Sequence, residues 1–290
     1  MKKVLIGCGI TAAVLVVVVI AVSAYFVSWF KNASPDSDHL KAVRTEMVEL
    51  YGERDDFTPP LDGELDSNRL GLFLEIREDL ILTRIEIASG LDEFLDLMKG
   101  DKERERNPFE KIVHGVQMLK GGAGLVTQGL TYLGARSEKL LESGMGEGEY
   151  FYLYSLMAFS WLEWDPLSEL DPDVVEEFDL EKDIEEMVEE YRRIFERQLR
   201  NQRDALRDIE SLTAAQEQAL EQVEVGLSRD SRRFPFEGQF PTAWIEKLQP
   251  YEFRFVDTLP RTPAEMLLDA ISLLDEDSGD GTIQVKFDDN

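Results

Sequence analysis

Cysteine and histidine are scarce in this chain, and their scarcity excludes several kinds of site. The only cysteine among 290 residues is Cys8, inside an uncharged apolar stretch. The rest of the chain therefore has no disulfide framework, no cysteine-based metal site and no thiol nucleophile. The two histidines, His39 and His114, are too few for a metal site built on several imidazoles. We expect no bound metal and no cofactor.

Positive charge is also in short supply. The chain has 31 Lys and Arg against 59 Asp and Glu, a formal net charge of −28. Such a charge repels the phosphates of nucleic acids and the head groups of anionic lipids, which excludes nucleic-acid binding and basic-patch docking on membranes. The ordinary interpretation is a solvated acidic surface; adaptation to a salty medium and a partner with a basic face are the alternatives.

Sequence motifs of common enzyme classes are absent. The chain has no two-histidine zinc motif, no Gly-x-Ser-x-Gly elbow, no phosphate loop and no dinucleotide fingerprint. The acidic tail does not match a calcium loop, because Phe287 stands where a bidentate glutamate is needed. We therefore predict no catalytic residues and a protein that is not an enzyme.

A long uncharged stretch lies close to the amino end of the chain. Residues Val4 to Phe30 carry no charge, and the stretch exceeds the roughly 20 apolar residues that cross a bilayer as a helix. We predict a transmembrane signal-anchor helix over residues 4–30, preceded by a short cytoplasmic tail of residues 1–3. Through this helix the membrane is the first expected partner.

Two other interpretations of this stretch remain open. Small residues ending at Ala24 resemble the cleavage site of a signal peptide, but the apolar run continues beyond them to Phe30. Cys8 lies in a sequence that resembles a lipoprotein box, but with almost no apolar segment before it. Aromatic residues near Phe30 suit a membrane interface and favour the permanent anchor.

The charges that flank the stretch predict its orientation. Lys2, Lys3 and the terminal amine precede it, whereas Lys31 on the other side is followed by Asp36 and Asp38, with Lys41 and Arg44 further on. The positive-inside rule then places the amino end in the cytoplasm and the main domain on the other side. We expect a single-pass protein of the cell membrane, the inner membrane in a bacterium, with an extracytoplasmic or periplasmic main domain.

Helical periodicity dominates the rest of the chain. We predict an all-α fold, in which an elongated multi-helix bundle with coiled-coil-like packing occupies residues 31–274 and an acidic flexible tail occupies 275–290. Capping signals at Thr213 and Thr262 mark two of the helix starts. The predicted helices cover residues 34–53, 67–98, 109–140, about 150–164, 174–209, 213–226, 242–255 and a last helix from 262.

Three glycines recur at seven-residue intervals in the helix predicted over 109–140. Gly115, Gly122 and Gly129 each cost about 0.8 to 1 kcal/mol of helix propensity relative to alanine, so some benefit must offset them. The structural interpretation is that another helix backbone approaches this stripe closely. The functional alternative is a ligand groove or a deformable helix.

The helix that follows is the most aromatic part of the chain. Tyr150, Tyr154 and Trp161 lie along one stripe, and the helix is apolar nearly all round. Such a helix should be enclosed by others, which predicts a central core helix. An aromatic pocket for an apolar or lipid-like ligand is the alternative.

Two arginines interrupt an apolar row in the helix predicted over 67–98. Arg77 and Arg84 are seven residues apart and stand at the edge of the buried seam. In an acidic protein the ordinary interpretation is an ion pair with a carboxylate on the next helix. An anion-binding pair is the functional alternative.

These features together favour a membrane-tethered, non-enzymatic envelope protein whose helical domain is an interaction or scaffold module. Its partner would be another protein or a second copy of the chain. The alternative is a carrier or sensor that holds an apolar or lipid-like ligand in its aromatic core. A more specific role does not follow from a fold class.

Overall fold

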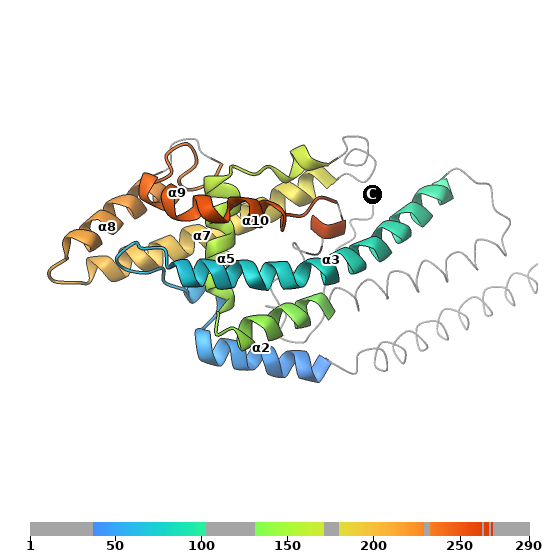
Figure 1. The fold of residues 1–290 in the computed structure, drawn as a ribbon, viewed down its shortest axis with the longest axis horizontal. Coiled ribbons are helices and arrows are strands. Elements are labelled where there is room, and N and C mark those ends of the chain that lie inside the picture. The colour runs from blue at the N-terminus through green and yellow to red at the C-terminus, as the bar shows by residue number, and fades with distance from the viewer. Residues whose placement is uncertain are drawn as a thin grey trace, which may run out of the picture.

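The computed structural model describes residues 37–102, 131–170, 180–228, 233–262, 264–266 and 268. Every regular element in this part of the chain is a helix, which confirms the predicted all-helical bundle (Figure 1). None of the described helices is long and apolar enough to cross a bilayer. The predicted anchor over 4–30, the glycine stripe at 115, 122 and 129 and the acidic tail lie outside the described residues.

Five α-helices form the framework of the described bundle: α2 (Ser37–Tyr51), α3 (Ser67–Lys102), α5 (Glu147–Ser155), α7 (Leu180–Arg207) and α8 (Ala214–Leu227). A further helix covers residues 131–142. The shorter elements are the 3₁₀ turns η1 (Arg54–Asp56), η3 (Pro166–Glu169) and η4 (Gln249–Tyr251), the π-helix η2 (Leu156–Trp161), and the helices α9 (Thr242–Leu248) and α10 (Glu252–Val256).

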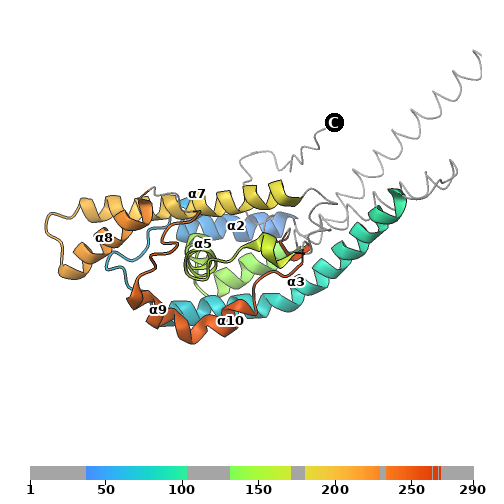
Figure 2. The same cartoon turned by 90° about the horizontal axis from the view of Figure 1, so that it is seen from above.

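Helix α5 is the centre of the core. It runs across the direction shared by α2, α3 and α7, and in Figure 2 it is seen end-on between them. Every residue from 150 to 160 is buried, as expected for a helix that is apolar nearly all round. The neighbouring helices of this core therefore meet around a crossing helix, whereas the sequence suggested coiled-coil-like alignment.

Local sequence signals account for several helix boundaries. Thr213 and Gln216 form the predicted capping box at the start of α8. The hydroxyl of Thr262 accepts a hydrogen bond from the backbone N–H of Glu265, as a cap does. The single helix predicted over 242–255 is instead divided into α9 and α10 by η4, because Pro250 lacks the N–H that a continuous helix needs.

An extended connection joins η1 to α3. Its two prolines, Pro59 and Pro60, cannot continue a helix, and Gly63 adopts a left-handed φ of 68°. The indole N–H of Trp244 donates to the Gly63 carbonyl at 2.8 Å, so α9 packs against this turn.

Candidate functional site

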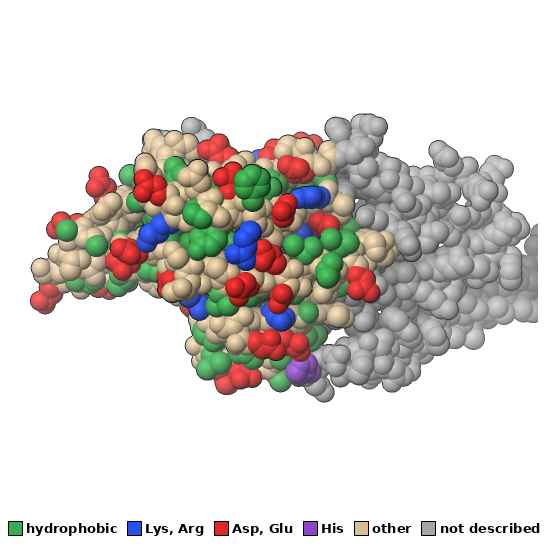
Figure 3. Space-filling model, viewed as in Figure 1, with side chains coloured by type: hydrophobic (Ala, Val, Ile, Leu, Met, Phe, Trp, Pro, Cys, Tyr) green, Lys and Arg blue, Asp and Glu red, His purple; other side chains and the backbone are tan. Residues whose placement is uncertain are grey.

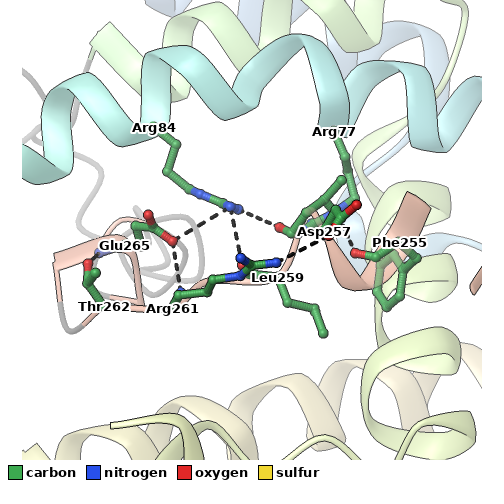
Figure 4. A network of polar contacts seen from close by, with 9 residues as sticks. Arg77, Arg84, Phe255, Asp257, Leu259, Arg261, Thr262 and Glu265 are labelled. Carbon is green, nitrogen blue, oxygen red and sulfur yellow. Dashed lines mark hydrogen bonds and ion pairs between the residues drawn. The ribbon is translucent and has the colours of Figure 1, made fainter. Parts of the chain in front are cut away.

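Arg77 and Arg84 lie buried between α3 and the segment that follows α10 (Figure 4). They project from α3 and are 4% and 5% exposed. Arg77 Nε donates to the Thr258 hydroxyl at 2.8 Å, Nη2 donates to the Thr258 carbonyl at 2.8 Å, and Nη1 donates to the Tyr150 hydroxyl at 2.9 Å. One guanidinium thus joins α3, α5 and the segment after α10.

Arg84 holds the next part of the same segment. Its Nη1 donates to the Thr258 carbonyl at 2.7 Å and its Nη2 to the Leu259 carbonyl at 3.4 Å. The Glu265 carboxylate lies 3.7 Å away as an ion-pair partner, and also accepts a hydrogen bond from the Arg261 N–H at 2.8 Å. Arg84 therefore has the carboxylate that the sequence suggested, together with backbone carbonyls that it did not.

The surroundings of the arginine pair show what it can do chemically. The guanidinium carbon of Arg77 lies 4.5 Å from the centre of the Tyr154 ring and 5.4 Å from that of Phe255, in cation–π range. An anion approaching the pair would have to compete with the carbonyls of Thr258 and Leu259 for the Nη donors, whereas the buried Nε of Arg84 has no hydrogen-bond partner in the described part of the chain. The geometry is that of a clamp on a chain segment.

The aromatic side chains of α5 contact other aromatic rings. Tyr150 and Tyr154 are buried, and the Tyr154 ring centre lies 5.1 Å from that of Tyr191 and 6.0 Å from that of Phe255. Trp161, at the end of η2, is only half-buried. The three predicted site residues thus share one helical segment, but only the two tyrosines are fully enclosed.

Two serine hydroxyls are buried in the same segment. Ser155 and Ser160 are each 1% exposed, and neither Oγ has a hydrogen-bond partner in the described part of the chain. They lie at the start of η2 and within it, and π-helical turns are frequent at functional sites. Burial raises the pKa of the neighbouring Tyr152 phenol, which stays neutral.

A row of amides on α7 was not expected from the sequence. Gln198, Asn201 and Gln202 donate from their side chains to backbone carbonyls of residues 54–60, at 2.5 to 3.3 Å, and Gln198 also donates to the Gly148 carbonyl at 2.9 Å. Amides three and four residues apart share one helix face. Gln198 is completely buried.

Helices α3 and α10, which the Arg254–Glu78 ion pair joins, each leave two large apolar side chains exposed. We call this surface the α3/α10 face and define it by Leu82 (78% exposed), Ile85 (47%), Phe253 (88%) and Val256 (39%). Figure 3, drawn in the view of Figure 1, shows apolar side chains interspersed with acidic and basic ones over these helices.

No group of three or more His, Cys, Asp or Glu side chains in the described ranges is arranged to hold a metal ion. No protein-family model, no curated protein and no solved structure matches this chain. Any functional assignment therefore rests on the sequence and on the contacts described above.

Proposed function

We propose that this protein is a membrane-tethered, non-enzymatic envelope protein whose helical bundle is an interaction or scaffold module. The α3/α10 face is the observation that supports the proposal. Buried polar side chains such as Arg77 and Gln198 hold the chain's own segments, whereas Leu82 and Phe253 remain available to another molecule.

The membrane tether is supported by the uncharged stretch over 4–30 and by the helix that follows it. Ser37 in α2 is the first described residue after this stretch, and the six residues 31–36 between them can span no more than about 20 Å. On the bundle, His39 Nε2 lies 2.7 Å from a Glu138 carboxylate oxygen, and α2 lies close enough to Gly134 that a Cβ there would clash with it. A bundle tethered in this way stays near the bilayer.

An apolar-ligand carrier is the second candidate, and one observation favours it. The unpartnered hydroxyls of Ser155 and Ser160 lie in the aromatic core beside a π-helical turn, where a ligand with one polar group would find hydrogen-bond partners. Against it, the rings of Tyr150 and Tyr154 already pack against protein rings.

One experiment separates the two functions. The full chain is cross-linked in the membranes of the cells that make it, purified, and analysed by native mass spectrometry. Cross-links to another protein or to a second copy, without retained small molecules, support the interaction module. A monomer that carries an apolar molecule supports the carrier and overturns the first proposal.

A further inference from the structure

The α3 half of the α3/α10 face has a large apolar side chain surrounded by carboxylates. On a helix, the neighbours of Leu82 are the residues three and four positions away, which are Glu78, Asp79, Ile85 and Glu86. Leu82 is 78% exposed and Ile85 47%. This surface is therefore an apolar centre with an acidic border.

The α10 half of the face cannot turn its apolar residues inward. Phe255 and Thr258 are fully buried on the inner side of this segment, and Thr258 is held by both buried arginines of α3. Arg254 donates to the Glu78 carboxylate from Nε at 2.7 Å and from Nη2 at 2.8 Å. Phe253, next to Arg254 in sequence, is thereby held outward, and Leu82 lies one helical turn beyond Glu78.

The charges around the face indicate which partner fits it. Its acidic residues in the described structure include Glu75 and Glu86, both exposed. The basic residues nearby are paired with carboxylates: Arg254 with Glu78, Arg261 with Asp257, and Lys139 with Asp79. Since the whole chain has a net charge of −28, a second copy or an anionic lipid surface would be repelled, and a basic partner attracted.

We propose that the α3/α10 face binds a basic amphipathic helix of another protein. Leu82 and Phe253 are the apolar anchors, and the acidic border pairs with Lys or Arg flanking the partner's apolar stripe. A helix suits the site because apolar side chains at three- and four-residue spacing match the apolar spacing of α3 and α10. This inference rests on the proposed interaction module and specifies its partner.

The test uses the full chain in nanodiscs of zwitterionic lipid, with empty nanodiscs as the blank. The probe is a fluorescent 18-residue peptide of leucine and lysine with its leucines on one helical face, and its anisotropy is measured at low and high salt. We expect binding that weakens with salt, and a loss of at least about tenfold in affinity for the double variant Leu82→Ser, Phe253→Ser. The matched control is Leu50→Ser, because Leu50 is 60% exposed but lies on α2.

A second variant tests the acidic border. Glu75→Gln combined with Glu86→Gln leaves the apolar anchors in place, and we expect a smaller salt dependence of peptide binding. Far-ultraviolet circular dichroism and thermal unfolding should be unchanged in both double variants, since all four side chains are exposed.

Several results would overturn the inference. Equal affinity of the Leu82, Phe253 double variant, or equal binding of a peptide with glutamates in place of lysines, would remove the basis for this partner. If the wild type is a homodimer that dissociates in the double variant, the occupant of this face is a second copy. If the wild type binds anionic vesicles and the double variant does not, the occupant is a lipid surface. If cross-linking in native membranes finds a protein partner that the double variant retains, the proposed function stands and this site is wrong.

Discussion

Replacing Arg77 by methionine tests whether the buried arginines hold the segment after α10 onto α3. Methionine keeps most of the volume and removes three hydrogen bonds, to Thr258 Oγ1, Thr258 O and Tyr150 Oη. Hydrogen bonds from a charged donor contribute about 1.5 to 3 kcal/mol each. Part of this loss is offset because methionine avoids the cost of burying a charge.

The remaining acceptors limit the damage. The Thr258 carbonyl keeps its hydrogen bond from Arg84 at 2.7 Å. We therefore expect the free energy of unfolding to fall by about 3 kcal/mol, which corresponds to roughly 6 to 12 °C in Tm for a domain of this size. Urea unfolding of the full chain, followed by tryptophan fluorescence, measures this loss.

Arg254→Met is the matched control. Arg254 also joins α3 to the α10 region, through two hydrogen bonds to Glu78, but its side chain is 42% exposed. An exposed ion pair contributes about 0 to 1 kcal/mol, so this variant should lose far less stability. Equal losses in the two variants would refute the reasoning from burial. A phosphate-dependent rise in the Tm of the wild type that Arg77→Met abolishes would instead favour an anion site.

Three further predictions concern other parts of the bundle. Gly226→Ala should lower the free energy of unfolding by about 1 to 3 kcal/mol, because its Cβ would lie 2.5 Å from Cζ of the buried Phe236. Gly71→Ala, in α3 with nothing within 4 Å of the new methyl group, should raise the free energy of unfolding by about 0.5 to 1 kcal/mol. Thermal unfolding measures both variants, with a lower Tm expected for Gly226→Ala and a higher Tm for Gly71→Ala. The hydrogen bond from Arg254 lowers the pKa of Glu78. A carboxyl group with a lowered folded-state pKa stabilises the fold above its unfolded-state pKa and loses that effect as pH falls through the folded-state pKa. The free energies of unfolding of wild type and Glu78→Gln should therefore converge at acidic pH. A difference that stays constant with pH would contradict this assignment.

Features set by neighbouring residues could be predicted from the sequence. The apolar rows over 67–98 correspond to α3, which extends to Lys102, and the capping box at Thr213 forms as predicted. The aromatic helix is enclosed on all sides, because a helix without a polar face has no stable place at the surface. Each of these signals lies within one or two helical turns.

Features that depend on distant residues could not be predicted. The hydrogen-bond partners of Arg77 include Thr258, 181 residues away in sequence, and nothing near Arg77 identifies a backbone carbonyl as its acceptor. The π-helical turn η2 was also missed, since one additional residue in a helical turn leaves apolar periodicity nearly unchanged. The buried position of Gln198 was missed too, because it depends on the connection over residues 54–60 that packs on α7.

Polar side chains inside this bundle and apolar ones outside it have a common cause. Helices satisfy their own backbone groups, but the connection over residues 54–60 and the segment at Thr258 and Leu259 leave carbonyls that need donors when buried. The amides of α7 and the two arginines of α3 supply those donors, and by holding Thr258 inward they hold Phe253 outward. The exposed apolar residues of α10 are thus fixed in position by the buried arginines of α3. A surface held in this way before binding loses little conformational entropy when a partner docks, which favours binding at this face.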